Sequence, residues 1–464
     1  MVAAAPFRAV DRSAWTASTA FICLHGLIAF WIWGCGPKMD HYQQLDQHVY
    51  HHQYDAALQL MQASREGYQG RNEALFYMEE GLLAHFAGRY RESIDSLLKA
   101  ESILDELYTR SISKQAASFV FNDNTIPYRG EDFEDAMVNL YLALNFAALG
   151  ATEDALVEAR QVDNELNLIN SRYDEDQKNV YREDAFIRFL MGVLYESGKE
   201  INDAFISYRK SEEIYRNDYA THYRVSAPRF LIENLLASAS ALGFDAEIKQ
   251  IRQRYPDVEF PRLEEKNDRA EIFIIHYNGI GPSKMERQWL IPMPDGYMAS
   301  IAYPVFEEKP YRISSGIVHL QNVDGNRRFG GQTELMEDIG FIAVQNLENR
   351  ISRIKAKAIT RATSKYMATK AASKAANDQA GELAGLLVQV AGNIAAAATE
   401  RADVRHWRML PDEIRVARML IPPGLYDGQI DFVDATGKIV QSTTLSAFAV
   451  SSGEKKFLFQ RTMQ

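Results

Sequence analysis

The chain has 464 residues, which is too many for one hydrophobic core, so two or three domains are expected. Hydrophobic residues make up 47% of it, which excludes a disordered chain, because that share is enough to offset chain entropy in packed cores. The net charge of −11 argues against general nucleic-acid binding, since a phosphate backbone is held by a basic surface.

The first 35 residues have the composition of an export signal. Residues 14–34 carry no charge, and Arg8 and Arg12 precede them. The stretch ends in Ile32-Trp33-Gly34-Cys35, which resembles the bacterial lipobox, in which the cysteine receives lipid. Two outcomes stay open: Cys35 becomes a lipidated N-terminus, or the segment persists as a signal anchor, since it is just long enough to span a bilayer.

Both outcomes place the rest of the chain outside the cytoplasm, because basic residues in front of an apolar segment hold the N-terminus inside. If Cys35 is lipidated, Gly36 follows it rather than an aspartate. Resemblance to lipoprotein sorting in Gram-negative bacteria then favours the outer membrane. We therefore expect a location in the cell envelope, on the periplasmic side, with a membrane contact through the N-terminal anchor.

Residues 40–255 repeat a helical pattern. In each frame small residues recur at the eighth and twentieth places of a helix pair, and larger apolar residues between them fill the groove; the clearest frames span residues 81–100, 142–159 and 191–208. The pattern resembles the tetratricopeptide repeat, a helix-turn-helix unit that stacks into a superhelix. Because stacked repeats leave a concave surface, we expect this groove to bind a peptide or protein; the alternative is a folded support without a ligand.

After residue 256 the hydrophobic period changes from helical to alternating, which predicts strands. Two sets are expected, and together they form one β-sandwich-like domain built from residues 270–332 and 403–464. The predicted fold class is thus multidomain α plus β: an N-terminal tetratricopeptide-like α-helical repeat array and a C-terminal β-sandwich-like domain with a long helical insertion. The expected strands are 271–277, 289–291, 300–306, 316–323, 413–421, 426–433, 439–445 and 457–459.

Residues 333–402 form that helical insertion, because apolar residues from Leu335 onward follow helical steps. Eight positive charges lie between Glu348 and Asp378 with no acidic residue among them, and residues 383–398 are almost wholly small or apolar. One interpretation is a helix held at an anionic lipid surface or in a self-association contact; the other is a helix packed on the β domain with a solvated basic face. The first interpretation selects Arg350, Arg353, Lys357, Arg361 and Lys365 as lipid contacts.

Three stretches, at residues 129–160, 189–210 and 402–418, together resemble a family of tetratricopeptide-repeat-containing lipoproteins of Gram-negative bacteria whose function is unknown. The family supplies no catalytic residue. Its members often resemble gene-order neighbours of outer-membrane activators of cell-wall synthases, which implies a partner class only. Within the third stretch, Asp403, Arg405 and Trp407 are interpreted as a polar anchor between helix and strand; the alternative is a surface hot spot for a partner.

Few residues suggest a catalytic or metal-binding role. His41, His48 and His52 could share one face of a helix, but no carboxylate or cysteine completes a metal-ligand pattern, so we expect solvated histidines and no metal. Sequence motifs of hydrolases, metalloproteases and phosphate-binding loops are absent. We therefore expect neither an enzyme nor a cofactor.

The leading hypothesis is an envelope-anchored scaffold that binds an envelope protein through its helical repeats, with a link to cell-wall synthesis. The alternative is a membrane-active or self-assembling envelope component that uses the basic and apolar helices of residues 350–398. The two hypotheses differ in which part of the chain does the binding, and the sequence names neither the partner nor the oligomeric state.

Overall fold

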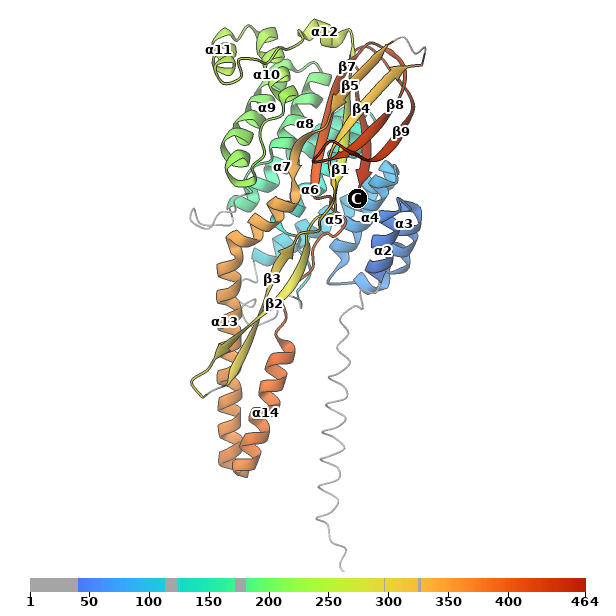
Figure 1. Cartoon of the computed structure of the whole chain (residues 1–464). Helices are drawn as coiled ribbons and strands as arrows, with labels where there is room; N and C mark the ends of the chain where they lie inside the picture. The colour runs from blue at the N-terminus through green and yellow to red at the C-terminus, as the bar shows by residue number, and fades with distance from the viewer. Residues whose placement is uncertain (1–40, 113–123, 125, 172–180, 296, 324–326) are drawn as a thin grey trace, which may run out of the picture.

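A computed structural model describes residues 41–112, 124, 126–171, 181–295, 297–323 and 327–464 (Figure 1). The expected signal or anchor segment, with Cys35, lies outside these residues. Helices form the first half of the described chain and strands predominate in the second. A long arm of helices and strands projects from one end of this body (Figure 1).

The helical half consists of antiparallel hairpins, so the predicted helical repeat region is confirmed in its coarse form. Its helices are α2 (His41–Tyr50), α3 (Tyr54–Ala63), η1 (Arg65–Tyr68), α4 (Glu73–Phe86), α5 (Tyr90–Ile112), α6 (Asp132–Ala148), α7 (Thr152–Ser171), α8 (Ala185–Ser197), α9 (Ile201–Ile214), η5 (Tyr215–Tyr223), α10 (Arg229–Leu242), α11 (Asp245–Arg254) and α12 (Leu263–Asn267).

Small residues let the two helices of a hairpin approach closely. A Cβ added at Gly81 of α4 would lie 2.6 Å from the Leu97 side chain of α5, and one at Gly192 of α8 would lie 2.4 Å from the Tyr208 ring of α9. Real Cβ atoms do not come so near, hence glycine is required at these crossings. Gly88, in the turn between α4 and α5, has a φ of +73°, a left-handed conformation that ends the first helix.

In the described part of the chain, the strands form two four-stranded sheets and one hairpin. The first sheet has the order β10-β1-β7-β6, the second β5-β4-β8-β9, and β2 pairs with β3. Strand β1 is parallel to β10 and antiparallel to β7. The strands are β1 (Ala270–Asn278), β2 (Ser283–Pro292), β3 (Met298–Glu307), β4 (Ile313–Asn322), β5 (Arg328–Gln332), β6 (Glu334–Asp338), β7 (Glu413–Ile421), β8 (Gly424–Asp434), β9 (Ile439–Val450) and β10 (Lys455–Thr462).

The first sheet is the middle layer of the molecule. Alternate residues of a strand point to opposite faces. On β1, Ile272 and Ile274 pack with the second sheet, whereas Phe273, Ile275 and Tyr277 pack in the cluster that includes the helices. All nine residues of β1 are accordingly buried. The layers are therefore helices, first sheet and second sheet.

Helix α13 (Ile339–Ala380) and helix α14 (Glu382–Thr399) follow β6 and precede β7. The expected helix start at residue 333 is wrong. Residues 334–338 form β6, which pairs with β7, and α13 begins only after Asp338, whose side chain accepts a hydrogen bond from the Phe341 backbone N–H. A carboxylate in this N-cap position satisfies a free N–H group of the first turn.

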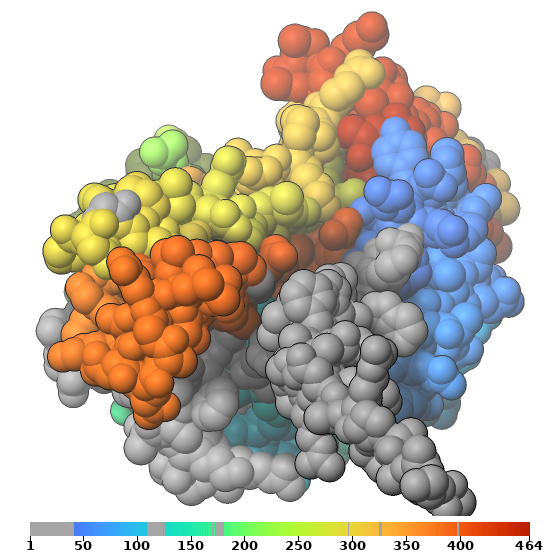
Figure 2. Space-filling model, turned by 90° about the horizontal axis from the view of Figure 1, so that it is seen from below, coloured from blue at the N-terminus to red at the C-terminus, as the bar shows by residue number. Residues whose placement is uncertain are grey.

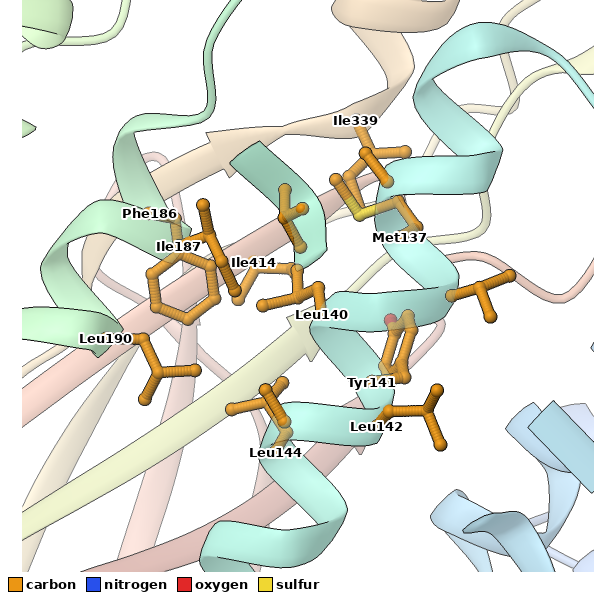
Figure 3. Packing of buried hydrophobic residues seen from close by; sticks show 14 of the residues in the cluster. Met137, Leu140, Tyr141, Leu142, Leu144, Phe186, Ile187, Leu190, Ile339 and Ile414 are labelled. Carbon is orange, nitrogen blue, oxygen red and sulfur yellow. The ribbon is translucent and has the colours of Figure 1, made fainter. Parts of the chain in front are cut away.

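The first helices of the hairpins turn their apolar sides to the first sheet. Figure 3 shows Met137, Leu140 and Tyr141 of α6 and Phe186 of α8 around Ile414 of β7. The face of the repeats that was expected to bind another protein is therefore covered by strands of the same chain, which corrects the expectation of an open groove. The reason is that the strands carry their own apolar residues on this face.

Candidate functional site

The segment of residues 402–411, here called the docking segment, runs between α14 and β7 and binds the repeats through its backbone. The Trp407 N–H donates to Glu134 of α6 (2.7 Å). The N–H groups of Arg408 and Met409 donate to the two carboxylate oxygens of Glu79 on α4 (2.8 and 3.2 Å). Buried carboxylates thus satisfy backbone donors that would otherwise be orphaned.

Burial alters the proton affinity of both carboxylates. It raises the pKa of Glu79 to about 8 and that of Glu134 to about 7, although the backbone N–H groups of the docking segment lower both. The nearby Arg408 ion-pairs with Asp46 of α2 at 2.5 Å. Near neutral pH the repeats therefore hold the docking segment with carboxyl groups that titrate in that range.

Arg405 is the polar anchor that the sequence predicts at this place. Its guanidinium ion-pairs with Asp403 at 2.6 Å and donates to Asn72 (3.1 Å) and to the carbonyl oxygen of Ile126 (3.1 Å). Trp407, which is 2% exposed, lies in the core. Because Arg405 and Trp407 are buried, these residues fasten the docking segment to the repeats and do not form a surface hot spot.

The projecting part of the molecule, here called the arm, consists of β2, β3, α13 and α14 (Figure 1). Its base is fixed by Glu131, at the start of α6, which pairs with Lys284 of β2 and Arg350 of α13. Burial raises the pKa of Glu131, but the two cations outweigh it and hold the pKa at about 2. One ionised carboxylate therefore ties the repeats to β2 and α13 of the arm.

The basic residues of α13 are mostly bound to acidic or aromatic groups of the same chain. Arg361 and Lys365 both pair with Glu400, at 3.0 and 2.8 Å, and Lys355 lies 4.4 Å from the centre of the Tyr303 ring. Arg353 and Lys357 are half-buried, and both have electrostatic or hydrogen-bonded partners.

The charge run is thus not a free basic face. Arg361 is buried and pairs with Glu400, and Arg350 is held by Glu131. The acids that neutralise them lie far away in the sequence, at residues 131 and 400, which is why the run looks unopposed in the sequence. That Arg350, Arg353, Lys357, Arg361 and Lys365 contact lipid stays a prediction. Among the described residues, no helix has the length and hydrophobicity needed to cross a membrane.

Helix α14 packs on α13 with its glycines and leaves its large apolar residues outside. A Cβ at Gly385 would lie 2.8 Å from Asn377, and one at Gly392 would lie 2.5 Å from Thr369. These glycines therefore serve a close helix contact within the chain. Several large apolar residues of α14 remain exposed, among them Leu383 (71%), Leu387 (62%), Val390 (49%) and Ile394 (65%).

These four residues, here called the seam, follow steps of four, three and four along α14. That spacing places them on one stripe of the helix, as in the contact positions of coiled coils. Leu386 widens the stripe and is 55% exposed. The charged residue of α14 is Glu382, and the helix has no lysine or arginine.

The hairpin β2–β3 lies along α13 and adds further apolar surface. Ala299 and Ile301 of β3 are buried against Ala358 and Ala362 of α13. Trp289 and Leu290 of β2 are each 54% exposed. In the space-filling view the yellow hairpin lies beside the orange helices (Figure 2). The arm therefore presents large apolar side chains on two of its elements.

The histidines considered as metal ligands lie apart from one another. Each has a separate partner: His41 hydrogen-bonds with the Tyr68 hydroxyl (2.8 Å), His48 with Gln53 (2.9 Å) and His52 with the Tyr54 hydroxyl (3.0 Å). Within the described ranges, no three histidine, cysteine, aspartate or glutamate residues are placed to hold a metal ion.

Comparisons with known proteins give weak matches to solved structures alone. No family model matches the sequence, and none of the curated proteins matches it. Among solved structures, MamA covers 48% of this chain and 95% of its own length at 14% identity and a TM-score of 0.29. BtubC from P. vanneervenii covers 47% and 81% at 19% identity and a TM-score of 0.31. RapI covers 46% and 51% at 11% identity and a TM-score of 0.33.

A likeness this weak identifies no ligand or partner for this chain. The helical repeat description rests on the hairpins themselves, and the surfaces of the arm and body must be interpreted from their own chemistry.

Proposed function

We propose that this protein is an interaction scaffold of the cell envelope that docks a helix of a protein partner on the seam of α14. The observation that carries the proposal is the seam itself: four large apolar side chains between 49% and 71% exposed, at coiled-coil spacing, on the projecting arm. In this proposal the two sheets act as a β-sandwich-like mount, and α13 and α14 act as an insertion that extends from it.

A protein helix suits the seam better than a lipid surface does. Anionic headgroups attract lysine and arginine, but α14 has neither, and several basic residues of α13 are paired within the chain. An amphipathic helix, by contrast, recognises apolar residues at this spacing by inserting its own side chains between them. Burying one large apolar side chain contributes roughly 1.5–3 kcal/mol, so four of them offset much of the cost of association.

The role of the repeats in this proposal differs from the hypothesis drawn from the sequence. Their inner face holds the first sheet and the docking segment, so the repeats support the arm, and the seam binds the partner. Binding requires no catalytic residue, and we propose none. A link to cell-wall synthesis stays part of the proposal, on the strength of the family resemblance alone.

Site-specific crosslinking in the native host tests the docking. A photoreactive amino acid at Leu387 of the full chain should form an adduct with one discrete protein, and Leu383→Glu in the same chain should abolish it. The matched control places the label at Val157 of α7, which is 53% exposed on the repeats and should give no such adduct. Adducts with lipid alone, or equal adducts from both positions, would contradict the proposal.

The same surface supports a second candidate function, self-assembly. An uncharged apolar stripe can face its own copy across a two-fold axis without like-charge repulsion. In the crosslinking experiment this candidate predicts an adduct of twice the chain mass and no other partner. That outcome would replace the first proposal with the second.

The envelope location is proposed from the N-terminal sequence and has its own test. Lipidation at Cys35 predicts that the mature membrane-bound protein begins with a lipid-modified cysteine, which mass spectrometry detects. An intact segment of residues 1–34 would favour the signal anchor. A cytoplasmic location of the full chain would contradict both forms.

A further inference from the structure

A pocket of about 400 Å³ lies between the first repeat hairpins and the strands β1, β9 and β10. Tyr54, Phe86, Tyr90, Tyr277 and Phe459 supply its aromatic lining. Neither aspartate nor glutamate lines it, although the whole chain carries a net charge of −11. A pocket of this volume, lined by aromatic side chains together with polar groups, is typical of small-molecule sites.

One buried cation lines this pocket without a counter-ion. Arg461 of β10 is 7% exposed, and its Nε and Nη1 atoms have no hydrogen-bond acceptor in the part of the chain that the structure describes. Its guanidinium carbon lies 4.9 Å from the centre of the Phe86 ring. No carboxylate of the described residues lies within ion-pair distance of it. Burying a charge is costly unless it is paired, so an unpaired arginine in a pocket favours a bound anion.

The neighbouring polar groups already form hydrogen bonds with one another. The Asn145 amide donates to Ser93 (2.8 Å), which donates to the Gly81 carbonyl (2.6 Å), so the Asn145 oxygen accepts a hydrogen bond from His85 Nδ1 (2.7 Å). His85 Nε2 therefore accepts from the Tyr277 hydroxyl (2.8 Å). Burial lowers the pKa of His85 to about 4, which keeps this imidazole neutral at physiological pH.

His85 thus does not contribute charge, and the guanidinium remains protonated, as arginine does in proteins. We propose that this pocket binds an organic carboxylate attached to an aromatic or apolar group. The Arg461 guanidinium donates hydrogen bonds to the carboxylate oxygens, and the aromatic walls cover the apolar part. Arginine is well suited to this task because its planar fork matches a carboxylate.

Binding of benzoate and 3-phenylpropionate to the purified full chain tests the proposal, with calorimetry as the readout. At least one of these acids should bind at millimolar concentration or better, and its amide should bind at least about tenfold more weakly. A short peptide ending in phenylalanine, compared as free acid and as amide, distinguishes a protein C-terminus from a free small acid. Failure of every acid to bind, or equal binding of acid and amide, would overturn the proposal.

Substitutions test whether the acid binds to Arg461 in this pocket. Arg461→Met should weaken the acid by at least about tenfold, and Arg461→Lys should weaken it less, because the charge remains but the fork is lost. Thr443→Tyr fills the pocket from β9 without altering Arg461 and should also abolish binding. Arg287→Met is the matched control: Arg287 is exposed on β2, pairs with Glu307 and lies outside the pocket, so this variant should bind normally.

Folding of the variants is checked separately. Because Arg461 is unpaired and buried, Arg461→Met should leave the thermal unfolding midpoint unchanged or raise it. A folded Arg461→Met protein that binds the acid as the natural chain does would refute the proposal. If Arg461→Met failed to fold, the folded Thr443→Tyr protein would decide, since unchanged binding there excludes the pocket.

Discussion

The contact between repeats and first sheet in the body differs from helix α14 of the arm in which side chains are buried and which are exposed. Between repeats and first sheet, charged side chains are buried: Glu196, Lys266 and Glu271 are each at most 3% exposed in their side chains, and Lys455 and Arg418 join them. On α14, large apolar residues are exposed instead, with Leu383 at 71%.

The difference shows which surfaces are buried when the chain folds and which remain available for binding. In the body every buried cation of this group has a carboxylate partner, so the charges fasten helices to strands and present nothing to solvent. In the arm, the exposed apolar side chains of α14 do not contribute to the core. A large apolar patch exposed on one element is more informative about function than a buried one, because the chain's own folding does not account for it.

The largest effect is expected at the centre of the buried charge group. Glu271→Ala leaves Lys266, Lys455 and Arg418 without their shared carboxylate. Breaking such a buried group is expected to lower the free energy of unfolding by about 3–5 kcal/mol. Denaturant unfolding measures it.

The matched control is Glu454→Ala. It removes the ion pair between Glu454 and Lys456, whose side chains are both partly exposed. That loss should be below about 1 kcal/mol. Equal losses in both variants would show that the buried group is not the main contact between helices and strands.

A smaller effect is expected at the base of the arm. Glu131→Gln removes the charge that holds Lys284 and Arg350, and Lys284 is only 5% exposed in its side chain. We expect a loss of about 2–3 kcal/mol, since buried charges then lack a counter-ion. Hydrogen exchange should show faster opening of β2 and α13 than of β1. Uniformly faster exchange over the whole chain would contradict an anchor that is specific to the arm.

The docking segment predicts a dependence of stability on pH. Burial raises the pKa of Glu79 to about 8, above the value of an unfolded glutamate, so the folded state binds the proton more tightly. Stability should therefore fall as pH rises between these two pKa values. From about pH 6 to about pH 7 the expected loss from Glu79 is about 1 kcal/mol.

Glu79→Gln, which stays uncharged, is the variant that isolates this contribution. Its unfolding free energy should change less over the same pH interval than that of the natural chain. Identical pH profiles in the two proteins would show that Glu79 is already ionised in the folded state.

The sequence predicts elements better than it predicts their partners. Periodicity indicates the helices of the repeats and most strands, because those patterns depend on neighbouring residues. It misplaces residues 334–338, which form the short strand β6, since a five-residue strand and a helix turn cannot be distinguished by period.

The contacts of the site residues are likewise not predictable from the sequence. Arg350 and Arg361 look unopposed because Glu131 and Glu400 are distant in sequence and come close only through the fold. Glu79 and Glu134 could have been noticed, since each is a carboxylate within a largely apolar helix. The pocket around Arg461 joins the first hairpins to the last strand, and no local pattern predicts that meeting.

The smallest effect on stability is expected for a substitution in the seam. It is also the sharpest test of the comparison between arm and body. Leu387→Glu replaces a side chain that is 62% exposed and packs little within the chain. Its unfolding free energy should change by less than about 0.5 kcal/mol, as for other surface substitutions. The buried control Leu97→Ala, at 0% exposure, should cost about 2–5 kcal/mol.

With the photoreactive label moved to Ile394 of the seam, the Leu387→Glu protein should lose the crosslinked partner, because a carboxylate placed in an apolar contact must be desolvated without a counter-ion. One substitution would then abolish docking and leave the unfolding free energy nearly unchanged. This is expected if the apolar surface of the arm serves binding and that of the body serves folding. A large loss of stability in Leu387→Glu would instead show that the seam packs within the chain. The comparison between arm and body would then fail, and with it the proposed docking surface.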